Sequence, residues 1–125
     1  MKKALIIACL LGGLSVILGA FGAHYLKEKL EPNLLESYKT GIRYMFLHSV
    51  VLLVINAVKL SNNKILNITN NLFFIGILLF TGSIIALSMG VITKLAGPLT
   101  PIGGLCLILG WISLALGIWR NKEIK

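Results

Sequence analysis

Long apolar runs without a charge constrain this chain more than any other feature of its sequence. Residues 4–23 carry no charged side chain, and as an α-helix this run would be about 30 Å long, which matches the hydrocarbon core of a bilayer. Uncharged runs also cover residues 72–93 and 102–119, and a shorter apolar run, residues 42–58, begins beside Arg43. The pattern predicts a membrane protein with four spans, at about residues 4–24, 42–58, 72–93 and 102–119.

Only 13% of the residues are charged and 57% are hydrophobic, whereas about a quarter of the residues of a soluble domain are charged. We therefore expect residues 1–125 to form one all-α domain, an integral membrane four-helix bundle. Lys2 and Lys3 before the first run would also suit a secretory signal, but three more hydrophobic segments follow that run. A multi-pass membrane protein is the better interpretation.

Residues 32–40, between the first two spans, have the pattern of an amphipathic helix. Pro32 suits the first turn of a helix, and apolar and polar side chains then fall on opposite faces. The apolar face holds Leu34, Leu35 and Tyr38, and the polar face holds Asn33, Glu36 and Lys39. We predict a short interfacial helix over residues 32–40, joined to the second span at Gly41.

Lysine and arginine residues are divided unevenly between the two sides of the membrane. With four crossings, seven of them share a side with both termini and five lie on the other side, which predicts cytoplasmic termini. The net charge of +8 does not indicate nucleic-acid binding, because the cations are scattered at the ends of the spans and form no basic stripe. Membrane lipids, anionic ones among them, are the partners that this charge favours.

Small residues recur at helical spacing along three of the spans. Helices in a membrane associate where small residues let their backbones approach closely. These residues are Gly12, Ser15, Gly19 and Gly22 on the first span, Gly82 and Ala86 on the third, and Gly110, Ser113 and Gly117 on the fourth. We expect them to pack the helices of one chain together, although the same stripes could also bind a second copy in a homo-oligomer.

Polar residues are predicted to gather at one end of the bundle, because the first and third loops lie on the same side of the membrane. The residues concerned are His24, Arg43, Tyr44, His48, Gly97, Pro98, Thr100, Pro101, Gly103 and Gly104. Thr100 followed by Pro101 predicts the start of the fourth helix, where free backbone N–H groups could bind a phosphate or carboxylate. The alternative is structural, with the histidines paired to each other, to Tyr44 or to loop carbonyls.

Cofactor and enzyme functions find little support in the sequence. No cysteine, aspartate or third histidine accompanies His24 and His48, so we predict neither a metal site nor haem. The acidic residues all lie outside the spans, and no nucleophile has an evident neighbouring base, so we expect no enzyme activity. These acids are Glu28, Glu31, Glu36 and Glu123.

Several motifs together resemble one family, the domain-of-unknown-function 423 family. They are Gly19-Ala20-Phe21-Gly22-Ala23-His24, Tyr44 with His48, Gly82-Ser83, Gly97-Pro98-Leu99-Thr100-Pro101-Ile102-Gly103-Gly104, and Gly110-Trp111. The resemblance covers nearly the whole chain and implies a small four-helix protein of bacterial membranes, similar to a mitochondrial transmembrane protein family; we expect a bacterial inner membrane. Met45 stands where that family often has glutamine, and Thr81 where it often has serine. The family implies no established activity.

The sequence therefore favours a noncatalytic membrane protein that binds a lipid or a partner protein through the polar cluster. The alternative function is that of a small oligomeric transporter or channel. Small multidrug exporters of this size depend on a glutamate within the first span, and residues 4–23 contain no acid. Proton-coupled export of cations is for that reason disfavoured.

Overall fold

The computed structural model describes residues 2–58, 63–91 and 93–121. Within these residues the chain is all-α, and each of its four long helices is long and apolar enough to cross a membrane. The helices are α1 (Lys2–His24), α2 (Pro32–Val58), α3 (Asn63–Ser88) and α4 (Thr93–Arg120), with a short 3-10 helix η1 (Leu26–Glu28) after α1. The predicted all-α membrane protein with four spans is confirmed.

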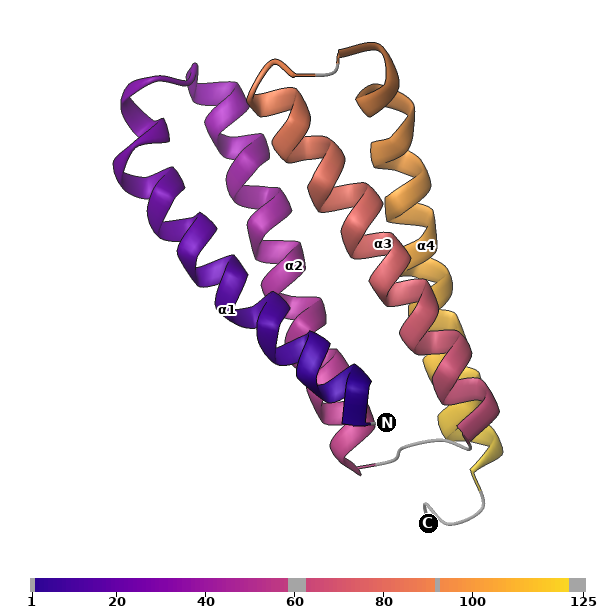
Figure 1. Cartoon of the computed structure of the whole chain (residues 1–125). Coiled ribbons are helices and arrows are strands. Elements are labelled where there is room, and N and C mark those ends of the chain that lie inside the picture. Colours follow the sequence, from indigo (N-terminus) through magenta and orange to yellow (C-terminus); the bar gives the residue numbers. More distant parts are fainter. Residues whose placement is uncertain (1, 59–62, 92, 122–125) are drawn as a thin grey trace.

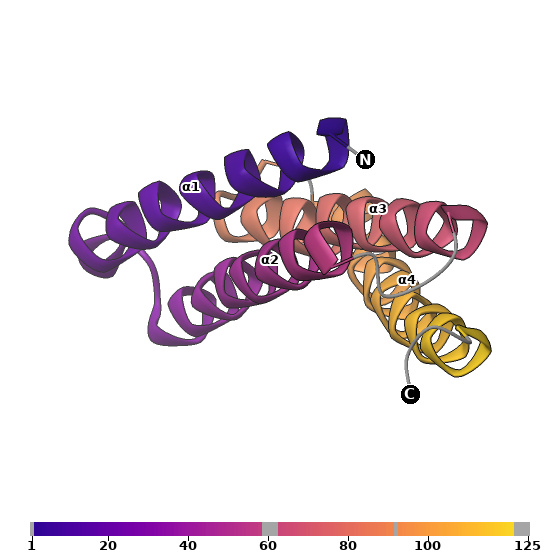
Figure 2. The same cartoon turned by 90° about the horizontal axis from the view of Figure 1, so that it is seen from below.

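Helices α2 and α3 lie at the centre of the molecule. Helix α1 packs against α2 and helix α4 packs against α3, so that α1 and α4 lie on opposite sides in Figure 1. Consecutive helices run in opposite directions. The α1–α2 and α3–α4 connections lie at one end, here called the loop end, and both termini lie at the other, the terminal end (Figures 1 and 2).

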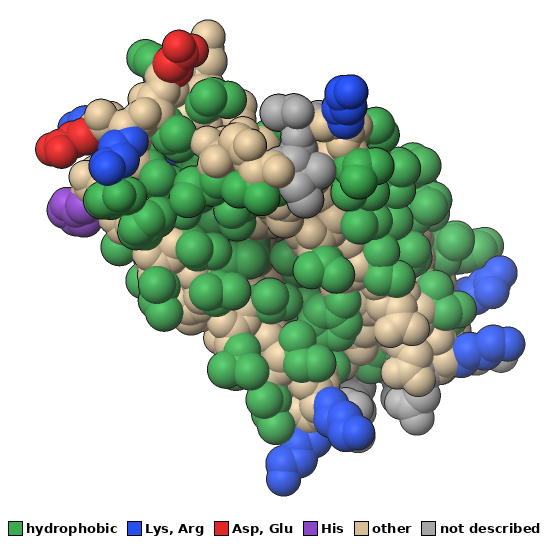
Figure 3. Space-filling model, turned by 45° about the horizontal axis from the view of Figure 1, so that its top comes forward, with side chains coloured by type: hydrophobic (Ala, Val, Ile, Leu, Met, Phe, Trp, Pro, Cys, Tyr) green, Lys and Arg blue, Asp and Glu red, His purple; other side chains and the backbone are tan. Residues whose placement is uncertain are grey.

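The surface suits a bilayer. Figure 3 shows hydrophobic side chains over most of one face, with lysine and arginine at both ends and acidic side chains at the loop end. Large apolar side chains such as Leu10, Ile17 and Leu78 are exposed along the helices, where acyl chains would cover them. The described cations of the terminal end are Lys2, Lys3, Lys64 and Arg120, and the predicted Lys59, Lys122 and Lys125 lie outside the described residues.

The separate interfacial helix predicted for residues 32–40 is wrong. These residues form the first turns of α2, which begins at Pro32 and continues without a break through Gly41. Gly41 is a contact point between helices, since its carbonyl accepts a hydrogen bond of 2.9 Å from Thr81 Oγ1. A Cβ atom at Gly41 would lie 3.2 Å from Ile84 Cγ2, so the missing side chain lets α2 approach α3.

The helix start predicted at Thr100 and Pro101 is also wrong. Helix α4 begins at Thr93 and includes Pro98 and Pro101 in its second and third turns, where each proline lacks the N–H group of a backbone hydrogen bond. The Thr100 hydroxyl donates to Ala96 O at 3.1 Å within this helix. The free backbone N–H groups predicted at a helix start beside Thr100 and Pro101 are therefore absent, because both residues lie inside α4.

Glycines bring α1 and α4 close to the central pair. A Cβ atom at Gly12 would lie 3.3 Å from Ser49 Oγ, and one at Gly22 would lie 2.5 Å from the Tyr38 ring, both on α2. On α4, Gly110 lies against the Phe73 ring of α3. The other predicted packing residues include buried Ser15 and Gly117, half-buried Gly19 and Ala86, and Ser113, whose hydroxyl lies 2.8 Å from that of Thr69. Gly82 differs from the prediction, because a Cβ atom there would meet nothing within 4 Å.

Candidate functional site

The structure divides the predicted polar cluster. His24 is exposed at the end of α1, which packs on α2, whereas residues 97–104 belong to α4 on the opposite side of the molecule (Figure 1). Arg43 is exposed on α2, and Pro98 and Pro101 are exposed on α4. His24 therefore does not join the α4 residues, and the remaining members of the cluster have to be considered without it.

Five predicted site residues line hollows between α2 and α4, with α3 as their floor. The upper hollow, at the loop end, has a volume of about 830 Å³, and the lower hollow one of about 350 Å³. The upper hollow is lined by Leu34, Glu36, Ser37, Thr40, Ile84, Leu87, Ser88, Gly97 and Thr100. The lower hollow is lined by Tyr44, His48, Phe80, Gly104, Leu107, Ile108 and Trp111.

The two hollows follow one another along the same helices and are together called the α2–α4 groove here. On α2 the lining passes from Thr40 to Tyr44, and on α4 it passes from Thr100 to Gly104, in each case one helical turn. From Ser37 to His48 the groove is about 16 Å long, given the rise of an α-helix. The uncharged part of α2 begins after Arg43, so the upper hollow lies near the headgroups and the lower hollow enters the hydrocarbon core.

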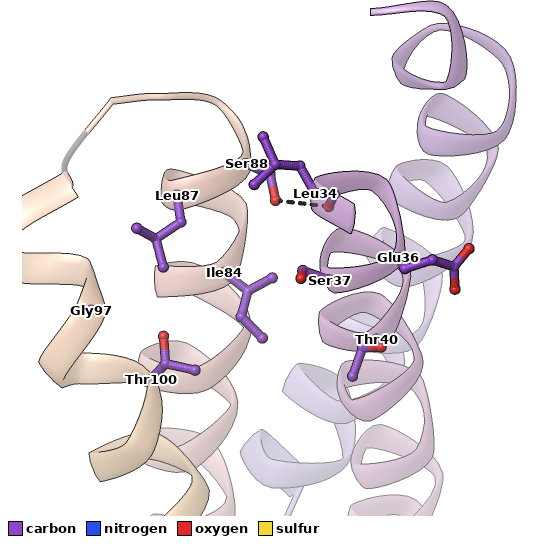
Figure 4. A pocket seen from close by; sticks show the side chains of 9 residues that line it. All are labelled: Leu34, Glu36, Ser37, Thr40, Ile84, Leu87, Ser88, Gly97 and Thr100. Atoms are coloured by element: carbon purple, nitrogen blue, oxygen red, sulfur yellow. Dashed lines mark hydrogen bonds between the residues drawn. The ribbon is translucent and has the colours of Figure 1, made fainter. Parts of the chain in front are cut away.

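The upper part of the groove carries hydroxyl groups. Figure 4 shows Ser37 and Thr40 on α2 facing Ile84 and the α4 residues Gly97 and Thr100, while the Glu36 carboxylate extends away. The Ser37 hydroxyl donates to Asn33 O at 3.0 Å, and the Thr100 hydroxyl lies 2.7 Å from that of Ser83. The Ser88 hydroxyl lies 3.5 Å from Leu34 O (Figure 4). The upper part of the groove therefore carries hydroxyl groups within a lining that is mostly apolar.

The lower part of the groove is aromatic, and His48 is its centre. His48 Nδ1 lies 2.7 Å from Tyr44 O, and because a carbonyl oxygen only accepts, Nδ1 carries the proton. His48 Nε2 then accepts a hydrogen bond of 3.1 Å from Trp111 Nε1. The Tyr44 ring centroid lies 5.0 Å from that of Phe80. The uncharged His48 ring therefore joins α2 to α4 by a hydrogen bond. This is a structural role, the alternative that the sequence left open for the histidines.

Trp111 and Phe80 are site residues that the sequence reasoning missed. Trp111 belongs to the Gly110-Trp111 motif, and its N–H group in the middle of an apolar span requires an acceptor, which was an available signal. Nothing in the sequence marked Phe80. Gly103 is buried against α3, where a Cβ atom would overlap the backbone of Phe80, and this contact holds Phe80 at the floor of the groove.

A third hollow, of about 450 Å³, lies between α1 and α3 over Met45. Its lining is apolar except for Thr81, whose hydroxyl is already bonded to Gly41 O. It therefore offers little to a polar headgroup.

Among the described residues, no group of three or more histidine, cysteine or acidic side chains could hold a metal ion.

Comparisons with known proteins identify relatives that are named as membrane proteins. The family described as "Protein of unknown function (DUF423)" matches residues 18–104. A UPF0382 membrane protein of Haemophilus influenzae is 38% identical over 123 residues, 98% of each chain. A UPF0382 membrane protein of Bacillus subtilis is 38% identical over 91 residues, 71% of this chain and 74% of its own. One from Schizosaccharomyces pombe is 34% identical over 84 residues, 66% of this chain and 70% of its own. No solved structure matches the chain.

Proposed function

The chain belongs to the DUF423 family of membrane proteins of unknown function, and we propose that it is a noncatalytic protein that binds a membrane lipid in the α2–α4 groove. The observation that supports this most is the mostly apolar groove itself, which carries hydroxyl groups at the loop end and aromatic and aliphatic side chains inside the hydrocarbon core. A lipid has the same order of groups, with its headgroup and esters at the membrane surface and its acyl chains below them.

The chemistry of the groove favours binding over catalysis. The titratable side chains among the described lining residues are Glu36, Tyr44 and His48. Both ring nitrogens of His48 are occupied by Tyr44 O and Trp111 Nε1, and the Glu36 carboxylate extends away from the hollow (Figure 4). A general base would need a free acceptor that faces the substrate, and neither group provides one.

The proposed orientation of the protein determines which leaflet supplies the lipid. We place the protein in a bacterial inner membrane with both termini in the cytoplasm, as the cation distribution favours. The loop end then faces away from the cytoplasm, and the bound lipid comes from the leaflet on that side. Exposed Arg43, at the hydrocarbon boundary, could attract an anionic headgroup there.

Filling the upper hollow should remove the lipid. Gly97 lines this hollow and a Cβ atom there would meet nothing within 4 Å, so Gly97→Leu should occupy the space without disturbing α4. We expect the fraction of protein that retains a phospholipid in native mass spectrometry to fall about tenfold, which corresponds to about 1.4 kcal/mol of binding free energy.

Gly13→Leu is the matched control, because Gly13 is also a helical glycine with nothing within 4 Å of its Cβ position and lies on α1, outside the groove. It should retain lipid like the unmodified protein. Equal retention by the two variants would contradict lipid binding in the groove. If instead solute flux through proteoliposomes were abolished by Gly97→Leu and not by Gly13→Leu, the transporter or channel alternative would be favoured.

A further inference from the structure

Two hydroxyl groups on the wall of the α2–α4 groove have no hydrogen-bond partner within the described part of the chain. They belong to Thr40 and Tyr44, which lie one turn apart on the same face of α2. The other hydroxyl groups of the groove differ, because those of Ser37, Ser88 and Thr100 all contact backbone carbonyls. Thr40 and Tyr44 therefore face the groove as unused donors.

The Tyr44 hydroxyl is accessible to a ligand at the hydrocarbon boundary. Tyr44 follows Arg43 at the start of the apolar run of α2, and its side chain is 41% exposed. Its ring is held by Phe80, at 5.0 Å between centroids, and by His48, at 5.8 Å, so the hydroxyl cannot readily turn away to the membrane surface. Any ligand that presents an oxygen acceptor beside Tyr44 gains a hydrogen bond in a medium of low dielectric constant.

We infer that Thr40 and Tyr44 bind the ester region of a glycerolipid, an inference that rests on the proposed lipid binding. The Tyr44 hydroxyl donates to an ester carbonyl, and the Thr40 hydroxyl, about 6 Å nearer the loop end along α2, donates to a phosphate or second ester oxygen. The acyl chain beyond the ester then follows the lower hollow, where Gly104 leaves room beside the Phe80 ring. The ligand class is an ester-linked glycerophospholipid.

The inference distinguishes ester lipids from ether lipids, because an ether-linked chain has no carbonyl to accept the Tyr44 hydroxyl. The test is native mass spectrometry of the full chain with equal amounts of a diester phospholipid and its diether analogue, matched in headgroup and chain length. The unmodified protein should retain the diester lipid in excess by about threefold or more, the scale of one net hydrogen bond.

Three variants test which residues produce the preference for the diester lipid. Tyr44→Phe keeps the ring contacts with Phe80 and His48 and should abolish this preference. Thr40→Val should reduce total lipid retention, and Thr40→Ser, which keeps the hydroxyl, should restore it. Tyr25→Phe is the control, since Tyr25 is exposed beyond α1 and outside the groove, and it should leave the preference unchanged.

Each outcome decides between the two proposals. Equal retention of the diester and diether lipids by the unmodified protein would overturn the ester-binding inference and leave lipid binding intact. A preference that survives in Tyr44→Phe would overturn it as well. If the unmodified protein retained neither lipid, the proposed function itself would fail. Because the lipid comparison is made on the unmodified protein, the test does not depend on the folding of any variant.

Discussion

Gly103→Ala is expected to destabilise the protein by at least about 2 kcal/mol, because the new methyl group has no space. A Cβ atom at Gly103 would overlap the backbone of Phe80, and a backbone cannot move aside as a flexible side chain can. Helices α3 and α4 would have to separate, and the buried contacts along both helices would weaken. The floor of the α2–α4 groove would move with them.

Gly82→Ala is the matched control for this change. Gly82 is also helical, but a Cβ atom there would meet nothing within 4 Å, so alanine should stabilise α3 by up to about 1 kcal/mol through its higher helix propensity. The free energies of unfolding of both variants can be measured in mixed detergent micelles. Equal stabilities for the two variants would contradict the close contact between α3 and α4.

Asn56→Leu is expected to cost roughly 1–3 kcal/mol, because it leaves a buried amide without its partner. Asn56 Nδ2 donates to Asn70 Oδ1 at 2.8 Å, and Asn70 Nδ2 donates to Asn56 Oδ1 at 2.9 Å. Both side chains are buried between α2 and α3, at 2% and 5% exposure, so the released amide of Asn70 finds no water. This pair joins the two central helices on the side of the bundle nearer the termini.

A double-mutant cycle separates the pair from the cost of either residue alone. Asn70→Leu should cost a similar amount, and the double variant with leucine at both positions should be more stable than the sum of the two single changes predicts. The same unfolding measurement provides the four free energies. Strict additivity would show that the two amides do not depend on each other.

The spans could be predicted from sequence because each depends on the composition of a single stretch. A run such as residues 4–23 has only one favourable environment, whatever its neighbours are. The ends of the helices were less accessible, since the uncharged run 72–93 continues past the end of α3 at Ser88 and α4 begins at Thr93, before the run 102–119. Gly41 was misassigned for a related reason, because a glycine can permit a bend or a close approach and only the neighbouring Ile84 decides which.

The candidate site was predicted only in part, because it depends on which helices are neighbours. The prediction that the first and third loops share an end agrees with the structure, but an alternating topology does not say that α1 packs on α2 and α4 on α3. His24 was for this reason grouped with residues that it does not meet. The partnership of His48 with Trp111 joins α2 to α4, and no spacing within either helix reveals it.

Lipid binding in the α2–α4 groove, the central claim, is tested most directly by photolabelling in a bilayer. A phospholipid with a diazirine in the middle of one acyl chain would be cross-linked to the reconstituted protein, and the modified residues would be identified by mass spectrometry. We expect saturable labelling at Phe80, Leu107 and Ile108, reduced by excess unlabelled phospholipid. Labelling spread over the exposed α1 residues Leu10, Val16 and Ile17, and unaffected by the competitor, would contradict the account.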